Sequence, residues 1–450
     1  MKAIVSLLLF ITLLLWIFTI YFTEKKKFRV VEYNPGEKYL LSRNMYFIIF
    51  TVCTAPMFLI PYALLKYGLW FGVMLFLLFS GRMRMKVDTM ITMYIVFFFW
   101  LCFSMTYTTT YWQGTMMLVK YSLPLLFIYL GYSSLDNEKD LIIFLKVVNW
   151  STCVYCFIMG GFAQHFLPWV YNFVGGILSV YAAFADFLVA VFIVPILLYW
   201  LTKDKKYIYC ALWMVLSTIL QSVRTGMGGM VLVFTFAMYL RYKQKSLPGI
   251  LFAGAVFIGT ILFVPSVNEK FFGEDAGTVT GSDIVQGNAL SFDNIEMSGR
   301  EYLWENAKTY CYKGHEMKGK GLGAGEYFCK HLMYDDGRES KMHNDYLVLL
   351  CDTGNIGVFL LVLFYIVVLT KIIAHIVIRR CNILVKITGI MALSSMAGIA
   401  FCMYFDNVVS NSMQSMIIPY IYLGFFLKAL DIEGKNKRTL AILRFRRERE

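Results

Sequence analysis

Long apolar runs separated by short polar segments make up most of the chain. A helix that crosses the hydrocarbon core of a bilayer needs about 20 mostly apolar residues, and runs of roughly this length recur along the whole sequence. We therefore predict an all-α fold, a polytopic bundle of transmembrane helices. The predicted spans are 3–22, 45–65, 90–107, 116–132, 141–162, 177–201, 207–222, 226–241, 248–265, 352–375, 384–405 and 413–430.

A further apolar run, Leu69–Phe79, is too short to be assigned by length alone. Lysine and arginine are retained on the cytoplasmic side of membrane proteins, so their positions indicate how the spans are oriented. If this run crosses and the N-terminus is outside, most cations fall in cytoplasmic segments. If it does not cross, Arg82, Arg84 and Lys86 fall on the same side as the one long polar segment. The charge pattern therefore favours 13 crossings over 12.

The composition agrees with a membrane protein, because 59% of the residues are hydrophobic, 16% are charged and the mean hydropathy is +0.62. The formal net charge of +13 follows from the cytoplasmic cations. It indicates contact with anionic lipid headgroups rather than with nucleic acid. The first span lacks a small-residue cleavage site and is followed by Lys25-Lys26-Lys27, so we interpret it as a retained anchor.

One long hydrophilic segment, residues 266–345, interrupts the apolar runs and has more acidic than basic residues. The charge rule places it outside the membrane. Its first part, 273–294, has no hydrophobic period and predicts an irregular linker. The predicted organisation is N-terminal transmembrane helices over 1–265, an external catalytic loop over 266–345, C-terminal transmembrane helices over 346–430 and a basic cytoplasmic tail over 431–450.

A helix is predicted to begin within this loop at Ser298. Ser298 and Glu301 have the spacing of a capping box, in which each side chain satisfies an unpaired amide at a helix start. Arg300 falls in the first turn, where a cation opposes the helix dipole. Its position is better explained if an anion binds at that helix end.

Glycines alternate with other residues over Gly319, Gly321, Gly323 and Gly325. Such a backbone reaches positive φ and can present its N–H groups to a phosphate or a sugar. The segment lacks the Lys-Ser/Thr ending of a nucleotide-binding loop. Two interpretations stay open, a glycan- or phosphate-binding loop and a tight turn that returns the chain to the membrane.

His343 stands where the loop enters the next apolar run, with Asn344 as the predicted N-cap of a helix and Asp345 in its first turn. A helix N-terminus disfavours imidazolium, which keeps a nearby imidazole able to accept a proton, although Asp345 acts in the opposite direction. The histidine is therefore a candidate general base. Capping, packing and local hydrogen bonding are the alternatives.

Three ionisable residues stand out among the spans. Arg224 lies on the predicted external side and so breaks the charge rule. It is either an arginine at the membrane interface or a fixed charge that binds an anionic headgroup. Asp186 and Asp406 lie in or at the end of apolar runs, where a carboxyl is often functional but is also explained by pairing with a neighbour.

Cysteine and metal-ligand spacing add little chemistry. Cys311 and Cys329 both lie in the external loop, where they either form a disulfide or act as two small buried hydrophobic residues. The histidines and aspartates of the loop lack compact ligand spacing, so the sequence predicts no metal site and no cofactor. These residues are His315, His331, Asp335 and Asp336.

Taken in order, these motifs resemble the O-antigen ligase and O-antigen polymerase superfamily. No single motif is specific, but their order and their common side of the membrane are. Members of this family usually have 12 spans, and the thirteenth crossing predicted here lies in the N-terminal third of the chain. The motifs are Arg224, Ser298-Gly299-Arg300-Glu301-Tyr302-Leu303-Trp304, the Gly319–Gly325 run, His343-Asn344-Asp345-Tyr346-Leu347 and Asp352-Thr353-Gly354-Asn355-Ile356-Gly357.

The resemblance implies a membrane-embedded glycosyltransferase of the C type in the bacterial cytoplasmic membrane, with its active site facing outward. Such an enzyme moves a glycan from undecaprenyl diphosphate to an acceptor hydroxyl, with inversion and without nucleotide sugar or metal. Arg224 and Arg300 are then expected to hold the diphosphate. His343 is expected to act as general base and Asp345 to orient it.

The resemblance leaves the acceptor and the partners open. A polymerase and a ligase are equally compatible with the motifs, and a chain-length regulator and a flippase are expected partners of such an enzyme. A lipid-linked glycan flippase is the competing function, although the chain lacks the internal duplication that is typical of transporters. A non-catalytic scaffold of envelope assembly is a third alternative.

Overall fold

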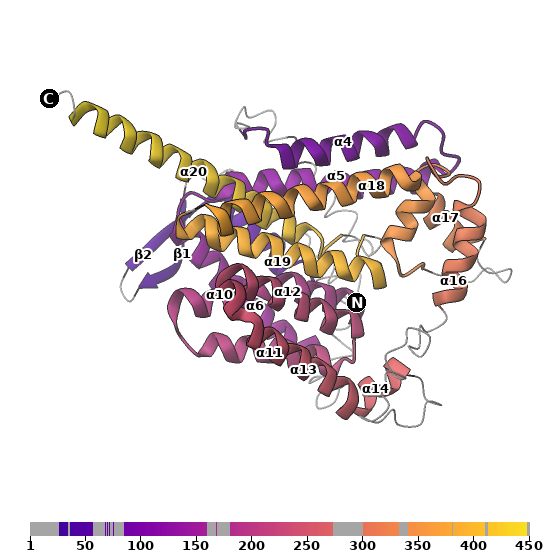
Figure 1. Cartoon of the computed structure of the whole chain (residues 1–450), viewed down its shortest axis with the longest axis horizontal. Coiled ribbons are helices and arrows are strands. Elements are labelled where there is room, and N and C mark those ends of the chain that lie inside the picture. Colours follow the sequence, from indigo (N-terminus) through magenta and orange to yellow (C-terminus); the bar gives the residue numbers. More distant parts are fainter. Residues whose placement is uncertain are drawn as a thin grey trace.

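The computed structural model describes residues 27–34, 37–56, 85–159, 181–272, 300–332, 341–379, 381–409 and 413–447, with the single residues 68, 70, 72, 75 and 168. The predicted first span, most of Leu69–Phe79 and the linker 273–294 lie outside these residues. Helices dominate the described chain, so the prediction of an all-α polytopic bundle is confirmed (Figure 1).

The described elements follow in the order of the sequence. They are β1 Lys27–Asn34, β2 Glu37–Ser42, α2 Arg43–Cys53, α4 Thr89–Ser104, α5 Tyr111–Ser134, α6 Glu138–Met159, α9 Tyr181–Val191, α10 Ile193–Thr202, α11 Lys206–Leu220, α12 Arg224–Tyr242, η1 Lys243–Ser246, α13 Leu247–Phe263, α14 Pro265–Phe272, α16 Arg300–Ala307, η3 Lys308–Tyr312, α17 Ala324–His331, α18 Asp345–Ile373, η4 Ala374–Ile378, α19 Ile383–Phe405 and α20 Ile417–Arg447.

Among the described residues, six helical segments are long and apolar enough to cross a membrane. Three shorter apolar helices also coincide with predicted spans. The protein is thus a multi-pass membrane protein. The six long segments are Tyr111–Ser134, Glu138–Met159, Ala182–Thr202, Arg224–Phe263, Asp345–Ile378 and Ile383–Phe405, and the shorter ones are Asn44–Cys53, Thr89–Ser104 and Lys206–Leu220.

A short hairpin is the exception to the helical pattern. Strands β1 and β2 pair antiparallel, with Lys27 opposite Ser42 and Asn34 opposite Glu37. In the sequence, β-branched and aromatic residues make up half of β1, and Asn34-Pro35-Gly36 between the strands is a turn signal. The hydropathy pattern did not predict this hairpin because the segment is neither long nor apolar.

Small residues allow the central helices to approach closely. A Cβ on Gly131 of α5 would lie 2.3 Å from the carbonyl oxygen of Ile421 on α20, and one on Gly424 would lie 2.2 Å from that of Ile128. In a bilayer the hydrophobic effect does not drive helices together, because lipid tails are as apolar as the side chains. Close crossings of this kind instead stabilise the helix pair by dispersion attraction between the two backbones. Helices α5 and α20 therefore pack almost backbone to backbone.

Helices α9, α12 and α19 form a second close junction. A Cβ on Gly226 of α12 would lie 2.9 Å from the Cβ of Ala185 on α9, and one on Gly229 would lie 2.8 Å from Val189. On α19, Gly398 faces Val189 and α12 with equally little room. This packing fixes the positions of the N-terminal end of α12 and the C-terminal end of α19 relative to each other.

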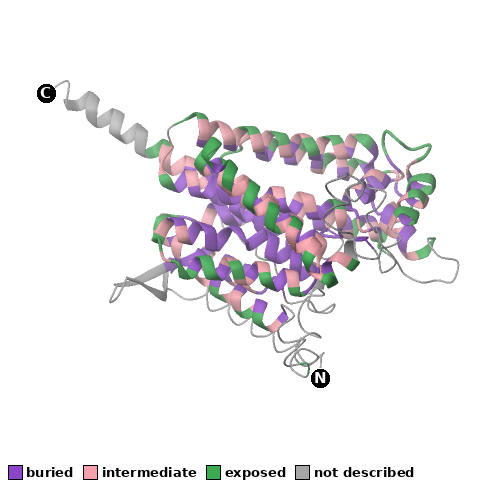
Figure 2. Cartoon of the chain, turned by 60° about the horizontal axis from the view of Figure 1, so that its bottom comes forward, coloured by how far each residue is buried: buried purple, intermediate pink, exposed green. Residues whose placement is uncertain are grey.

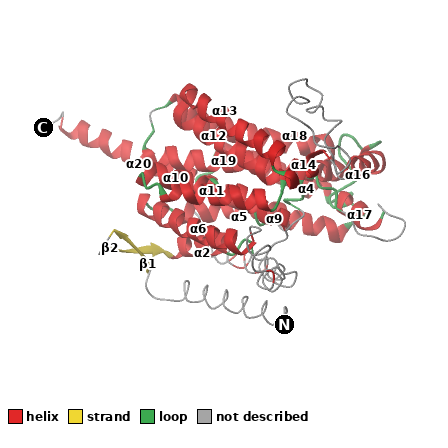
Figure 3. Ribbon diagram, turned by 90° about the horizontal axis from the view of Figure 1, so that it is seen from below, coloured by secondary structure: helices red, strands yellow, loops and turns green. Residues whose placement is uncertain are grey.

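The two ends of the bundle differ in their elements. Helices α14, α16 and α17 gather at one end, whereas the β1–β2 hairpin and the C-terminal end of α20 lie at the other (Figures 1 and 3). Burial is strongest along the middle helices (Figure 2). By contrast, α13 has no buried residue and covers the bundle loosely.

Two helices depart from the predicted boundaries. Helix α20 continues to Arg447, through the segment predicted to be a basic tail. Helix α18 is interrupted at Gly354, whose φ of 64° and ψ of −166° are not helical. The freed amide of Asn355 donates to the carbonyl of Glu316 at 2.7 Å, so the loop that precedes α18 supplies the acceptor that the broken helix lacks.

Candidate active site

The centre of the candidate site is the turn that leads into α18. Asn344 is the N-cap of that helix, as predicted, because its side chain accepts a hydrogen bond from the amide of Leu347 at 2.9 Å. His343 precedes it with a φ of 50°, a left-handed conformation that is unfavourable for a residue with a side chain. Its ring is 37% exposed, so it remains accessible beside buried neighbours.

The C-terminal end of α19 supplies the partners of this histidine. The backbone amide of His343 donates to Oδ1 of Asn407 at 2.9 Å, which turns the NH₂ group of Asn407 toward the imidazole. Nδ1 of His343 lies 2.9 Å from Nδ2 of Asn407 and 3.4 Å from Oδ1 of Asp406. The unusual backbone conformation is thus held by contacts with a distant helix end.

These contacts allow the neutral ring two tautomers. With the proton on Nε2, Nδ1 accepts from the amide of Asn407. With the proton on Nδ1, the ring donates toward Asp406 and leaves Nε2 as a free acceptor, but the NH₂ group of Asn407 then has to turn away from Nδ1. Asp406 is nearly fully buried, and its Oδ1 also accepts a hydrogen bond from the backbone N–H of Asn407 at 2.7 Å. A fixed carboxylate therefore faces the same nitrogen that would carry the proton in a base-competent ring.

Asp345, which was expected to orient His343, is held by the segment that follows α19. Its carboxyl is only 1% exposed, and its Oδ2 accepts from the amide of Val409 at 2.8 Å. This bond attaches the start of α18 to the residues that follow Asp406 and Asn407. Asp345 therefore anchors the turn that carries the histidine's partners, and the carboxylate at the imidazole is Asp406.

Arg300 reaches the same place from the external loop. Its guanidinium donates through Nη1 to the carbonyl oxygen of Phe405, the residue before Asp406. One turn further along α16, Nε1 of Trp304 donates to the carbonyl of Met342 at 2.8 Å. The two side chains at this i,i+4 spacing thus dock α16 against both halves of the site. The predicted cap at Ser298 lies outside the described residues.

Burial lowers the pKa of the Arg300 guanidinium, and the nearby Asp406 carboxylate opposes that change. Arginine stays charged in proteins even when partly desolvated. A partly buried guanidinium is poorly hydrated, so an anion that replaces water there gains a stronger electrostatic attraction than it would at an open surface. The arginine is therefore suited to bind an anionic group beside His343.

Arg224 is the first residue of α12 and lies near the same end of α19. The carbonyl of the next residue, Thr225, accepts from the thiol of Cys402 at 3.8 Å, and a Cβ on Gly228 would meet the ring of Phe401 at 2.7 Å. Cys402 is one helical turn before Asp406. The structure thus brings Arg300 and His343 together at the turn that follows α19, with Arg224 at the adjoining helix end.

The glycine run is used differently. Gly319, Gly321 and Gly323 all have positive φ, and the amide of Gly321 donates to the carbonyl of Asp352 at 3.0 Å. The amide of Gly325 donates to Oδ1 of the same aspartate at 2.7 Å. Internal partners thus occupy two of the amides that a phosphate-binding loop would present. This geometry favours the tight turn over the glycan- or phosphate-binding loop.

Close packing explains why the run needs glycine. A Cβ on Gly321 would lie 2.5 Å from the Cα of Thr108, and one on Gly323 would lie 2.2 Å from the amide nitrogen of Gly114. In addition, the hydroxyl of Thr108 donates to the carbonyl of Leu322 at 2.8 Å. The glycine run therefore packs tightly against the loop after α4, the start of α5 and the broken helix α18.

Sequence reasoning missed two of the residues that surround the imidazole. Asp406 was singled out only as a carboxyl at the end of an apolar run, and Asn407 was not considered. Asp186 was singled out in the same way. It is 1% exposed, and both its carboxyl oxygens lack a hydrogen-bond partner among the described residues. It lies against Cys402, below the turn that carries Asp406.

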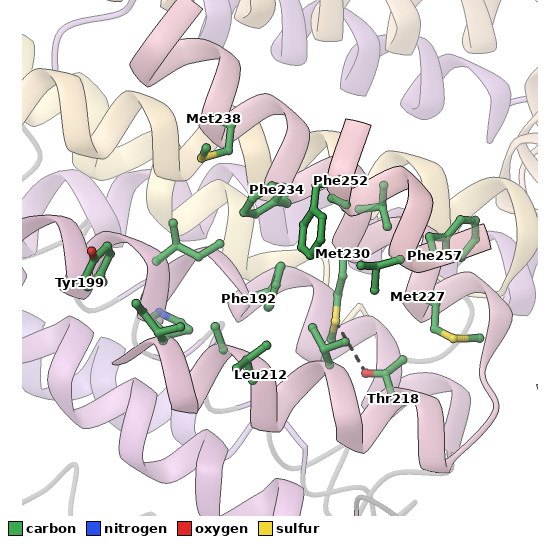
Figure 4. Close-up of a pocket in the computed structure, with 18 of the residues that line it drawn as sticks. Phe192, Tyr199, Leu212, Thr218, Met227, Met230, Phe234, Met238, Phe252 and Phe257 are labelled. Atoms are coloured by element: carbon green, nitrogen blue, oxygen red, sulfur yellow. Dashed lines mark hydrogen bonds between the residues drawn. The ribbon is translucent and has the colours of Figure 1, made fainter. Parts of the chain in front are cut away.

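An apolar groove of about 430 Å³ lies between α10, α11, α12 and α13. Figure 4 shows Phe192, Phe234 and Met230 pointing into it. Among its few polar groups, the hydroxyl of Thr218 is satisfied by the carbonyl of Met214 at 3.0 Å and contacts the sulfur of Met230 at 3.7 Å. The groove reaches Met227, one turn from Arg224 along α12.

Together, the helical bundle and the polar cluster at one of its ends define a multi-pass membrane protein with a candidate active site at a helix–loop junction. Comparison with known families gives the class of chemistry. Residues 209–362 match the family model described as O-antigen ligase. No curated protein matches the chain.

The match confirms the resemblance to the O-antigen ligase and polymerase superfamily and supports glycosyltransferase activity of that general type. It covers most of α11, all of α12, α13 and α14, the polar segment 266–345 and more than half of α18. Arg224, Arg300, His343 and Asp345 fall inside the matched residues, whereas Asp406 and Asn407 fall outside them. The membrane and polysaccharide-biosynthesis assignments are therefore supported by both the family and the helices.

Proposed function

We propose that the protein transfers a glycan from undecaprenyl diphosphate to an acceptor hydroxyl at the outer face of the cytoplasmic membrane. The observation that carries the proposal is the meeting of Arg300 and His343 at the turn after α19. A transferase of this type needs cations for a departing diphosphate and a base for an incoming hydroxyl. Both groups are available within one small region.

The arginines hold the diphosphate. Its charge increases as the bond between the anomeric carbon and the phosphate oxygen breaks, so positive groups stabilise the transition state more than the bound donor. Guanidinium groups bind phosphate oxygens in pairs, which also fixes the donor's orientation. Arg300 reaches the diphosphate from α16 and Arg224 from the start of α12, and two guanidinium groups supply charge stabilisation from the chain itself.

His343 accepts the proton of the acceptor hydroxyl as its oxygen attacks the anomeric carbon. In this step the NH₂ group of Asn407 moves away from Nδ1, Nδ1–H donates to Asp406, and Nε2 receives the proton. The carboxylate then stabilises the imidazolium that forms. Asn407 holds the backbone of His343 in its left-handed conformation. A single displacement from the face opposite the diphosphate inverts the anomeric centre.

The apolar groove receives the prenyl chain of the donor. Its lining offers no charged side chain, and its end at Met227 lies close to Arg224 on the same helix. A lipid diphosphate has an apolar tail next to two phosphates, which corresponds to the order of groove and arginine along α12. Burial of apolar surface contributes about 25 cal/mol per Å², so even part of the chain adds substantially to donor affinity.

The acceptor is another lipid-linked glycan in a polymerase and a separate molecule, such as a lipid A core, in a ligase. A chain-length regulator and a flippase are expected to work beside the enzyme. The first experiment is reconstitution of purified protein in liposomes with a lipid-linked glycan donor and candidate acceptors. Glycan transfer that depends on His343 supports the proposal, donor movement without transfer supports a flippase, and the absence of both supports a scaffold.

A further inference from the structure

Three cysteines from different elements converge behind the candidate site. Cys311 lies on η3, Cys329 on α17 and Cys351 on α18, and they are 1%, 6% and 0% exposed. All ten cysteines of the chain are free thiols in the structure. The sequence raised the pairing of Cys311 with Cys329, but Cys351 also approaches Cys311, because η3 and α18 pack against each other.

The contact between Cys311 and Cys351 is fixed by its surroundings. Sγ of Cys351 lies 3.9 Å from the carbonyl of Ala307, one turn before Cys311 along the helix. Next to Cys311, the hydroxyl of Tyr312 donates to Oδ1 of Asn355 at 3.1 Å. Next to Cys351, its own carbonyl accepts from the amide of Lys320 at 2.9 Å. Both backbones are therefore docked so that the two side chains meet.

A second thiol pair offers an internal comparison. Cys153 on α6 and Cys210 on α11 also lie close together, because Nδ2 of Asn149, one turn before Cys153, donates to Sγ of Cys210 at 3.4 Å. Cys210 is in the second turn after Lys206, at the end of α11 that the charge pattern places in the cytoplasm. Disulfides persist in oxidising compartments outside the cytoplasm and are rare inside it. The two pairs thus have similar surroundings, but Cys153 and Cys210 lie within the predicted spans 141–162 and 207–222, whereas Cys311 lies in the loop that the charge pattern places outside the membrane.

We propose that Cys311 and Cys351 form a disulfide in the mature protein, which joins the external loop covalently to α18. The inference rests on the outward orientation of the proposed active site. The two thiols lose two protons and two electrons, and a protein dithiol oxidase or a low-molecular-weight disulfide accepts them as its own disulfide is reduced to two thiols. No atom of the proposed glycan donor takes part.

The reaction precedes the final packing of the loop. The thiolate is the reactive form, and both thiols are buried in the folded protein. Burial also raises the pKa of the neighbouring Cys329 to about 12, which keeps that thiol protonated and unreactive. Once formed, the bond is shielded from reductants in the same way. It holds η3, the continuation of the helix that carries Arg300, against the helix that begins beside His343.

The test is a map of thiols in protein taken from its native membrane. Free thiols are alkylated under denaturing conditions, and the unreduced protein is digested with trypsin and analysed by mass spectrometry. Cleavage after lysine separates the three cysteines into peptides 309–313, 321–330 and 342–371. We expect peptide 309–313 to be joined to peptide 342–371, and Cys153 and Cys210 to be alkylated.

Alkylation of both Cys311 and Cys351 before reduction would overturn the proposal, as would a link between peptides 309–313 and 321–330. A second measurement compares melting temperatures with and without a membrane-permeant reductant. Wild-type protein and Cys153→Ser should lose several degrees, whereas Cys351→Ser should not respond. Neither measurement uses enzyme activity. If both thiols were free but His343-dependent glycan transfer were intact, the disulfide would be rejected and the proposed function would stand.

Discussion

The glycine run and the histidine turn are both polar, both lie in the external loop, and both suggested chemistry in the sequence. In the structure they differ in how their polar groups are used. The amides of Gly321 and Gly325 are occupied by Asp352. The ring of His343 keeps an exposed edge and is held by side chains of another helix. Polar groups that are already paired support a fold, and those held with one side open are available to a substrate.

The largest expected effect is the loss of the imidazole. Replacing His343 by Ala removes the base, and general-base assistance is typically worth about 10²–10⁴-fold in rate. We expect glycan transfer in proteoliposomes to fall by that factor with unchanged expression and melting temperature. His331→Ala, at the exposed last residue of α17, is the matched control and should transfer normally.

Loss of the guanidinium comes next. Arg300→Gln keeps the length of the side chain approximately but removes its charge, and the loss of one such stabilising group costs about 10²–10³-fold in rate. Single-turnover transfer with saturating donor measures this effect on the chemical step. Lys313→Gln, in the same loop, controls for the loss of a cation in general, and an equal loss of rate there would remove the specific role of Arg300.

The variant Asp406→Asn tests whether the carboxylate of Asp406 assists the imidazole of His343. A hydrogen bond to a charged group is worth about 1.5–3 kcal/mol, so the transfer rate should fall by about 10- to 100-fold. The donor KM should change little because Asp406 acts through His343. Asp431→Asn, at the opposite end of the bundle, should leave the rate unchanged. A rate for Asp406→Asn within twofold of wild type contradicts its role.

A smaller effect is expected from filling the groove. Ala253→Trp places a large ring among the lining residues and should raise the KM for a donor with a long prenyl chain by about tenfold, which corresponds to about 1.4 kcal/mol. A short-chain donor should respond less. Ala255→Trp, on the same helix but outside the groove, is the control, and equal effects of the two variants would exclude the groove.

The smallest effect on transfer is expected in the glycine run. Gly321→Ala puts a Cβ 2.5 Å from Thr108 at a φ of 104° and should lower the melting temperature by several degrees. Gly314→Ala has a φ of 83° but open space around it and should lose less stability. If Gly321→Ala lost turnover in fully folded protein, the run would belong to the active site.

Local patterns predicted part of this site. Asn344 was expected as the N-cap of α18, and the structure confirms it, because a cap depends on residues within one turn. Asp406 and Asn407 were not expected beside His343, since α18 and α19 separate them in sequence and only helix packing brings them together. For the same reason the sequence suggested Asp345, the adjacent carboxyl, as the group that orients His343, whereas the proposal above gives this role to Asp406, whose Oδ1 lies 3.4 Å from Nδ1.

The fold shows the same division between local and distant information. Hydropathy predicted the apolar helices well, because a membrane span is defined by its own residues. The break in α18 at Gly354 was not expected, since it requires the backbone of the glycine segment to replace the missing helical bonds. The β1–β2 hairpin was also missed, because a search for long apolar runs has no sensitivity to short strands.

The most direct test of the central claim is a structure of the protein in a lipid bilayer with the undecaprenyl diphosphate-linked donor bound. The account predicts the diphosphate in contact with Arg300 and Arg224, the imidazole of His343 facing the anomeric carbon, and the prenyl chain in the groove between α10 and α13. A diphosphate bound at the other end of the bundle, away from both arginines, would contradict it.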